Sequence, residues 1–254
     1  MVDLNKLILV KEKLSSNIPT IGSWLQIPSP ISAQILSSSS SFDWICVDLE
    51  HSSIGIETCE NLFRSIEQSG SLPIVRLSAN DEVQIKRVLD SGASGIIVPM
   101  IKDLESLLYA REAMHFPPKG KRGVGLARAQ DWGESFDSYR DFQENLLLIA
   151  QIEHIEAVQN IDEIFASDLL DAYIVGPYDL SASLGKPGDF DSEDFKEAVK
   201  KIETAAKANN VPPGYHLVEP DKKRLKELLD DGYIFVAYSI DTLMLREAGK
   251  LDDK

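Results

Sequence analysis

The 254-residue sequence contains few cysteines and few positive charges, and each shortage excludes some classes of protein or partner. Its two cysteines, Cys46 in a predicted strand and Cys59 in a predicted helix, provide no disulfide framework. The 26 lysines and arginines are outnumbered by 41 acidic residues, which gives a formal net charge of −15. An acidic balance of this size argues against nucleic acid or an anionic membrane surface as a partner.

Several other signals are missing. No segment has the run of about 20 apolar residues that a membrane span requires, and residues 1–13 carry too much charge for a signal peptide. We therefore expect a cytoplasmic protein with no membrane partner. No Gly-x-Gly-x-x-Gly fingerprint follows the first predicted strand, which disfavours a dinucleotide-binding fold. The sequence also lacks a Ser/His/Asp or Cys/His nucleophile context and a lysine that ends a strand in an apolar setting, which disfavours Schiff-base chemistry.

What the sequence does contain is a regular alternation of short apolar runs and amphipathic segments. The expected strands occupy residues 20–27, 42–48, 72–77, 95–100, 146–153, 171–177, 214–217 and 233–240. The expected helices occupy residues 30–38, 55–69, 81–92, 103–116, 155–166, 192–209, 221–231 and 242–250. Eight strand-then-helix units without hairpin signals predict an α/β fold, a single (β/α)8 TIM barrel at about residues 20–250. The chain is then one domain, residues 1–254, with an N-terminal helix or extension at 1–19.

Two segments interrupt the alternation. The serine run at residues 37–41 is interpreted as a loop that leads into the second strand. Residues 117–139 are rich in proline, glycine and positive charge, and we expect a long structured loop there. Long loops in compact domains are more often functional than idle.

Polar and charged side chains gather where the predicted strands end. They are Trp24, Gln26, Asp48, Glu50, His51, Arg76, Gln151, Glu153 and Asp179. One such residue is usually an ordinary loop residue, but the carboxyl ends of barrel strands converge on one mouth, where active sites lie. The set therefore predicts an active site at the mouth of the barrel.

Glu153 and Asp179 end neighbouring predicted strands, which lie about 4.8 Å apart in a sheet. Two carboxylates that close repel each other unless a cation lies between them. A site with few protein oxygens suits Mg²⁺ or Mn²⁺; the alternative is an ion pair with Arg76 and no metal. His51 is cast as a general base, although a lone histidine is often only structural.

The chemistry that fits these residues is formation of an enolate. A divalent ion would chelate an α-keto acid and polarise its carbonyl, while a base moves the proton. Arg76 would hold the developing oxyanion or the carboxylate. If the metal offsets Glu153 and Asp179, we expect Arg76 to remain as the unmatched positive charge of the mouth.

A series of motifs is similar to the pyruvate-dependent class II aldolases, a family that includes 4-hydroxy-2-oxoheptanedioate aldolase and 2-dehydro-3-deoxyglucarate aldolase. The motifs are Phe-Asp-Trp-x-x-x-Asp-x-Glu-His at residues 42–51, Val-Arg at 75–76, Leu-Asp-x-Gly-Ala-x-Gly-x-x-x-Pro at 89–99, Phe-Pro-Pro-x-Gly-x-Arg-Gly at 116–123, Gln-Ile-Glu at 151–153 and Gly-Pro-x-Asp-Leu-Ser at 176–181. Each is weak alone, but together they cover about residues 22–245 and are highly specific.

The resemblance implies a (β/α)8 barrel that cleaves a 4-hydroxy-2-oxo acid reversibly to pyruvate and an aldehyde. It implies that Glu153 and Asp179 hold Mg²⁺, Mn²⁺ or Co²⁺, and that His51 is the base, acting through water, with Asp90 raising its basicity. It gives Arg76 a role in the transition state and Gln151 a contact with the pyruvyl part. Trp24, Tyr178 and Asp179 are further candidates for substrate contacts. It also implies a homo-oligomer, a trimer of dimers that exchange their last helix.

The sequence departs from that pattern in three places, of which the first is the serine run before Phe42, where the family has a more ordinary helix end. Tyr178 stands where the family usually has a small residue, and residues 212–216 match only loosely, in a region that helps to select the aldehyde. Two rival functions stay open. One is a citrate-lyase-like or malyl-CoA lyase activity on a CoA thioester, for which Lys119, Lys121 and Arg122 form the only obvious cationic cluster. The other is a non-catalytic keto-acid-binding or assembly protein on the same scaffold.

Overall fold

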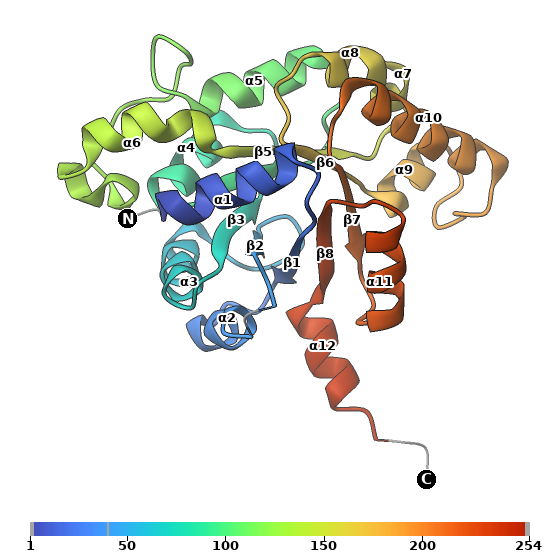
Figure 1. Ribbon diagram of the computed structural model, residues 1–254, viewed down its shortest axis with the longest axis horizontal. Helices are drawn as coiled ribbons and strands as arrows, with labels where there is room; N and C mark the ends of the chain where they lie inside the picture. Colours follow the sequence, from blue (N-terminus) through green and yellow to red (C-terminus); the bar gives the residue numbers. More distant parts are fainter. Residues whose placement is uncertain (1–2, 40, 252–254) are drawn as a thin grey trace.

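The computed structural model describes residues 3–39 and 41–251 and contains a closed barrel of parallel strands in the order of the sequence (Figure 1). The strands are β1 Thr20–Leu25, β2 Trp44–Asp48, β3 Leu72–Arg76, β4 Gly95–Val98, β5 Leu147–Ile152, β6 Ala172–Val175, β7 Pro213–Leu217 and β8 Phe235–Ile240. The barrel closes where β1 pairs with β8, with Thr20 opposite Phe235. The predicted (β/α)8 architecture is confirmed.

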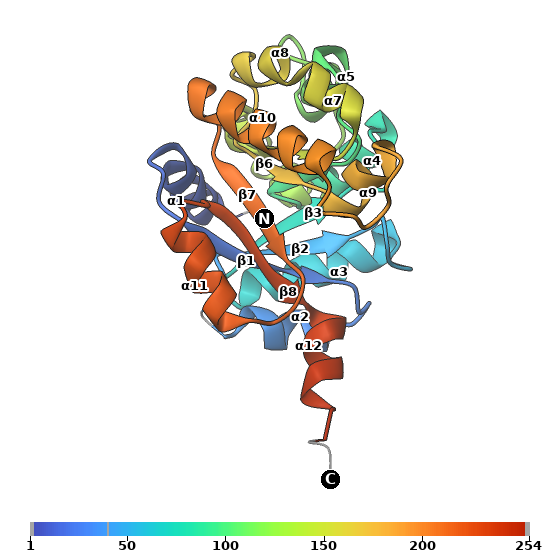
Figure 2. The ribbon, with the colours of Figure 1, turned by 90° about the vertical axis from the view of Figure 1, so that its right-hand side faces the viewer.

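Helices follow the strands around the barrel (Figures 1 and 2). They are α1 Leu4–Ser15, α2 Pro30–Ser37, α3 Ile56–Gln68, α4 Glu82–Asp90, α5 Leu104–Met114, η1 Arg128–Gly133, α6 Phe136–Phe142, η2 Gln143–Asn145, α7 Ile155–Gln159, α8 Ile161–Ala166, α9 Pro177–Ser183, α10 Glu193–Asn209, α11 Lys222–Asp230 and α12 Asp241–Ala248. In both views α12 projects away from the barrel at the end of β8. None of the helices in the described part of the chain is long and apolar enough to cross a membrane.

The structure differs from the predicted elements in three places. The helix predicted at 155–166 is broken at Asn160 into α7 and α8. The segment 117–139 is not one loop, because η1 and the first residues of α6 lie in it. A short helix, α9, occupies residues that were predicted to be loop, and Pro177 at its first position suits a helix start. Within the serine run, Ser37 ends α2, whereas Ser40 lies outside the described residues.

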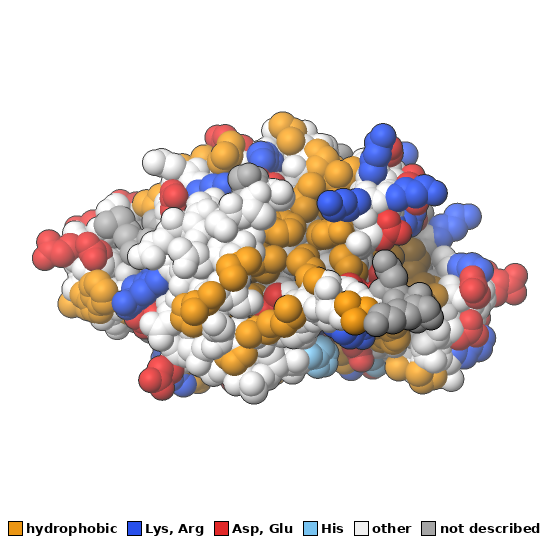
Figure 3. Space-filling model, turned by 90° about the horizontal axis from the view of Figure 1, so that it is seen from below, with side chains coloured by type: hydrophobic (Ala, Val, Ile, Leu, Met, Phe, Trp, Pro, Cys, Tyr) orange, Lys and Arg blue, Asp and Glu red, His pale blue; other side chains and the backbone are white. Residues whose placement is uncertain are grey.

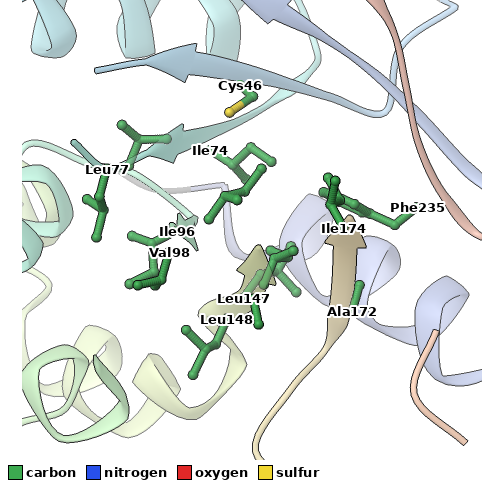
Figure 4. Packing of buried hydrophobic residues seen from close by; sticks show 14 of the residues in the cluster. Cys46, Ile74, Leu77, Ile96, Val98, Leu147, Leu148, Ala172, Ile174 and Phe235 are labelled. Atoms are coloured by element: carbon green, nitrogen blue, oxygen red, sulfur yellow. The ribbon is translucent and has the colours of Figure 1, made fainter. Parts of the chain in front are cut away.

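Apolar side chains from the strands fill the barrel and the layer between strands and helices (Figure 4). Every residue of β2, β3 and β5 is buried. Trp44 and Phe235, near the amino ends of β2 and β8, stack with ring centroids 4.1 Å apart. Gly22 of β1 permits this packing, because a Cβ there would lie 2.1 Å from the Trp44 ring. The aromatic pair fills the amino-terminal end of the barrel and leaves the polar residues at the other end.

Candidate active site

A cavity of about 300 Å³ opens at the carboxyl ends of the strands. It is lined by Trp24, Gln26, His51, Arg76, Gln151, Ile174, Val175, Gly176, Pro177, Tyr178, Asp179, His216, Val218 and Ile240. Six of the nine strand-end residues predicted from the sequence therefore line one mouth. Glu153 is buried just beyond β5 and is hydrogen-bonded to the lining residue Gln151.

Arg76 and Asp48 form the central ion pair of this mouth. They are register partners on β3 and β2, so their side chains leave the sheet next to each other. Arg76 donates from Nε to Asp48 Oδ1 at 2.9 Å and from Nη2 to Oδ2 at 2.7 Å. Its third nitrogen, Nη1, lies 3.1 Å from Glu50 Oε2. The prediction that Arg76 is an unmatched charge is wrong, because two carboxylates already face it. The alternative pairing of Arg76 with Glu153 and Asp179 is not seen either.

Asp48 also fixes the loop that carries the candidate base. Its Oδ1 accepts hydrogen bonds from the backbone N–H groups of Glu50 at 3.0 Å and His51 at 3.3 Å. Burial acts to raise the pKa of Asp48, but the hydrogen bonds and charge of Arg76 outweigh it and hold the pKa below its usual value. Asp48 thus remains charged and orients both the guanidinium and the β2 loop.

Glu153 is a buried carboxylate of the mouth, and among the described residues neither it nor Asp179 forms an ion pair with a basic side chain. It accepts a hydrogen bond from Met100 N–H at 2.7 Å and another from the amide of Gln151. Met100 has a φ of 55°, a left-handed conformation that is uncommon for methionine. The net pKa of Glu153 is raised to about 7. Burial is the largest cause, its two hydrogen bonds lower the pKa, and the charges of Glu50 and Asp179 raise it further. The three acids therefore lie close enough to repel one another.

The residues around Glu153 fit a divalent cation. A Cβ at Gly176 would lie 2.5 Å from Glu153 Oε2, so the glycine leaves the space that this carboxylate occupies. Asp179 lies in the first turn of α9, directly after β6, which pairs with β5. No group of three or more His, Cys, Asp or Glu ligands gathers among the described residues. A donor set of two carboxylates with room for other oxygens matches the preference of Mg²⁺, which keeps several waters.

His51 lies at the rim of the mouth with an exposed side chain. Its Nε2 is 3.8 Å from Glu50 Oε2, the one carboxylate within 4 Å of it among the described residues. Asp90 does not take that place. It ends α4, which places it at the amino-terminal end of the barrel, and it accepts a hydrogen bond from Arg122 at 2.6 Å. The predicted pairing of Asp90 with His51 is therefore not made within one chain.

Trp24 lies at the floor of the cavity, and Tyr178 lies at its entrance. Trp24 on β1 is buried and lies beneath Arg76, whose guanidinium carbon is 5.5 Å from the ring centroid. Tyr178 on α9 is 65% exposed and packs edge-on against Phe190, with centroids 5.1 Å apart. Tyr178 therefore stands at the entrance rather than at the floor.

Sequence reasoning missed a polar lining residue, His216 of β7. It lies one residue before the end of β7, so a search for polar residues near the strand ends would have found it. It stacks on Trp24 with centroids 4.5 Å apart.

The cationic cluster considered for a CoA thioester is not at the mouth. Lys119 pairs with Glu144 at 2.8 Å, and Lys121 lies 3.5 Å from Glu112. Arg122 is buried against Phe116 and Tyr139 and bonds Asp90. These residues follow α5, and none of them lines the cavity.

A parallel (β/α)8 barrel with acids, an amide, an arginine and a histidine around the carboxyl ends of its strands has the architecture of a barrel enzyme. The chain belongs to the HpcH/HpaI aldolase/citrate lyase family, whose model matches residues 20–248. It is similar to a 4-hydroxy-2-oxo-heptane-1,7-dioate aldolase of Klebsiella pneumoniae, with 36% identity over 92% of this chain and 88% of the relative.

Solved structures of related proteins support the same family assignment. An HpcH/HpaI aldolase/citrate lyase family protein from Burkholderia cenocepacia superposes with a TM-score of 0.87 and 30% identity, covering 94% of this chain and 95% of its own. The citrate synthase SbnG gives a TM-score of 0.81 with 26% identity over 94% of this chain and 93% of its own.

Proposed function

We propose that this protein is a metal-dependent aldolase that cleaves a 4-hydroxy-2-oxo acid reversibly to pyruvate and an aldehyde. The observation that carries the proposal is Glu153, a buried carboxylate with two hydrogen bonds and no cation beside it, in the mouth of an aldolase-family barrel. Asp179 adds a second carboxylate at the next strand. Glu153 is buried while Asp179 is exposed, and a buried carboxylate close to two other acids is costly unless a cation lies near it, which a divalent ion would supply.

Glu153 and Asp179 would hold the divalent ion, Mg²⁺, Mn²⁺ or Co²⁺. When bound, that ion polarises the 2-oxo group and stabilises the negative charge of an enolate. Gln151 bonds Glu153 and fixes its orientation, and its position in the cavity suits a contact with the pyruvyl part of the substrate. Tyr178 and Asp179 border the opening through which substrate enters.

Arg76 would stabilise the negative charge that develops in the reaction, and His51 would transfer the proton. In the cleavage direction the 4-hydroxyl loses its proton, the C3–C4 bond breaks, and the pyruvyl carbon C3 later gains a proton. His51 lies at the rim, where a water can carry a proton between its ring and the substrate. Arg76, held by Asp48 and Glu50, presents a fixed guanidinium toward the oxygen that becomes negative.

The homo-oligomer that the resemblance implies belongs to the same proposal. Ile31 and Ile35 on α2 are each 68% exposed, and so is Leu245 on α12. They line an apolar groove of about 420 Å³ between these helices. Figure 3 looks onto the face from which α12 projects, and hydrophobic side chains gather across it. A second copy, contributing its own α12, would cover this groove.

The oligomer also bears on Asp90. Because Asp90 is at the opposite end of the barrel from His51 in one chain, it could act on a histidine only across an interface. The chain itself we treat as one barrel domain, since Leu7, Val10 and Leu14 of α1 join the same apolar core as the strands. A cytoplasmic location remains an expectation from composition.

The rival functions have less support. A CoA ester needs cations for its phosphates, and the Lys119, Lys121 and Arg122 cluster is paired with acids away from the mouth. A binding protein without activity would have no need for the set of His51, Arg76, Glu153 and Asp179, and all of them are present.

The test is release of pyruvate from a panel of 4-hydroxy-2-oxo acids. EDTA should abolish release, and added Mg²⁺, Mn²⁺ or Co²⁺ should restore it. His51→Ala should lower the rate about 10²- to 10⁴-fold, as expected for loss of a general base. Release that continues at full rate in EDTA would contradict metal dependence, and release at wild-type rate in His51→Ala would remove His51 from the mechanism.

A further inference from the structure

Two buried ring nitrogens at the mouth, Nε1 of Trp24 and Nε2 of His216, have no hydrogen-bond partner within the described part of the chain. They belong to rings that stack on each other at 4.5 Å with an interplanar angle of 20°. Both residues line the active-site cavity. Buried polar atoms in proteins are nearly always bonded, so an adjacent unpaired pair beside a cavity calls for a ligand group.

The two nitrogens have opposite chemistry. An indole Nε1–H can only donate a hydrogen bond. Burial, and then the nearby charge of Arg76, lowers the pKa of His216 to about 4, so its ring is neutral near pH 7. A hydrogen bond to the backbone of Ser239 raises the pKa of His216, as a carbonyl that accepts from the ring does, and because Nε2 has no partner this bond is made by Nδ1. The proton is therefore on Nδ1, and Nε2 is left as an acceptor.

A donor beside an acceptor matches a hydroxyl group, which both accepts and donates. The lining residues Val218, just after β7, and Ile240, at the end of β8, are apolar. The amide of Gln26, after β1, already donates a hydrogen bond to Asp48. Arg76 is the only lysine or arginine among the lining residues, and Asp48 and Glu50 already face it. Within the described chain the cavity thus offers no free cation to a distal carboxylate.

The position of the pair assigns it to one half of the substrate. The pyruvyl half belongs with Gln151, Glu153 and Asp179, which come from β5 and the start of α9. Trp24 and His216 come from β1 and β7, on the side of the mouth where β7, β8 and β1 are neighbours. The aldehyde half of a 4-hydroxy-2-oxo acid extends away from the pyruvyl group, and these strands remain to contact it.

We propose that Trp24 and His216 form a subsite for a hydroxyl group on the aldehyde half, which makes uncharged hydroxyaldehydes the preferred products of cleavage. The inference rests on the proposed aldolase activity. It assigns His216 as a specificity-determining residue and disfavours aldehydes that lack a hydroxyl or carry a distal carboxylate.

The test compares substrates that differ by one hydroxyl. Release of pyruvate is measured with 4,5-dihydroxy-2-oxopentanoate, with 4-hydroxy-2-oxopentanoate, and with 4-hydroxy-2-oxoheptanedioate for the distal carboxylate. The ratio of kcat/KM for the first two substrates should favour the dihydroxy acid by about tenfold or more in the wild type, the size expected for one buried hydrogen bond. The heptanedioate should also be the poorer substrate.

His216→Phe keeps an aromatic ring against Trp24 and removes the acceptor, so the ratio should fall toward one. Trp24→Phe removes the donor and should lower the same ratio. His115→Phe is the matched control, because His115 is also buried with an unpaired Nε2, but it follows α5 at the other end of the barrel. The control should keep the wild-type ratio.

The outcomes separate the two proposals. If no substrate releases pyruvate with any divalent metal, the proposed function fails and this inference fails with it. If pyruvate is released but the ratio is the same in wild type, His216→Phe and Trp24→Phe, the subsite alone is overturned and the nitrogens hold only water. A wild-type preference for the heptanedioate would likewise overturn the subsite and leave the aldolase proposal standing.

Discussion

At the scale of single residues, the partners of Arg76 decide how the mouth is charged. Its guanidinium makes two parallel hydrogen bonds to Asp48 and a third contact to Glu50. The charge of Arg76 is therefore neutralised by two acids, and the carboxylates of Glu153 and Asp179 have no positive side chain beside them in the described part of the chain. Arg76 has two roles to fill, since it holds a buried carboxylate and also faces the cavity.

Arg76→Lys separates these roles. Lysine keeps the positive charge but cannot reproduce the two parallel bonds, which leaves Asp48 partly unpaired in a buried position. We expect the free energy of unfolding to fall by about 1–3 kcal/mol, measured by urea denaturation. Because the guanidinium is also positioned for the reaction, kcat for pyruvate release should fall at least about tenfold.

Arg64→Lys is the control, since Arg64 pairs with Glu60 on the exposed surface of α3. It should change neither quantity much, because exposed pairs contribute little. Wild-type turnover in Arg76→Lys, together with a loss of stability, would reduce Arg76 to a structural residue.

Sequence predicts which residue types stand at the strand ends, because a charged group after an apolar run marks the point where a strand leaves the core. It does not predict their partners. Asp48 faces Arg76 because β2 and β3 pair in a register that aligns them, and register depends on packing across the whole barrel. Asp90 is a different case, since the predicted helix at 81–92 already places it at the far end of the barrel, whereas its partner Arg122 depends on how the segment after α5 folds.

At the scale of elements, the strands and long helices were predictable because their apolar periodicity is strong. The short helix α9 and the break at Asn160 were not, because a helix of one or two turns has too few residues to show a period. α12 was predicted as a helix, but its separation from the barrel depends on Asp241. Its carboxylate accepts hydrogen bonds from Gln26 N–H at 2.9 Å and Ile27 N–H at 3.0 Å, which fixes where the helix departs.

The groove between α2 and α12 predicts self-association. Leu245→Glu and Ile35→Glu each place a charge in a surface that a second copy would bury, which is costly without a partner. We expect sedimentation velocity to show a shift from a homo-oligomer toward the monomer. Ile18→Glu is the control, because Ile18 is also exposed but precedes β1 at the other end of the barrel. A wild-type protein that sediments as a monomer would contradict the proposal.

At the scale of the whole molecule, the charge of −15 opposes the entry of a keto-acid anion. Screening limits this effect beyond about 8 Å at physiological salt. Whether the anion enters the cavity therefore depends on the charges of the mouth itself. Arg76 is already balanced there, and Glu153, Asp179 and Glu50 share the remaining negative charge. A divalent cation is thus needed to make the mouth attractive to an anion as well as to stabilise an enolate.

The most direct test of this account is exchange of the methyl protons of pyruvate in D₂O, followed by proton NMR. It reports enolate formation and requires no knowledge of the aldehyde. The account predicts exchange with Mg²⁺, none in EDTA, and a fall of at least about 100-fold in Glu153→Gln. Glu156→Gln, at an exposed neighbouring glutamate, should exchange like the wild type. Exchange that proceeds at the same rate in EDTA, or in Glu153→Gln, would contradict the central claim.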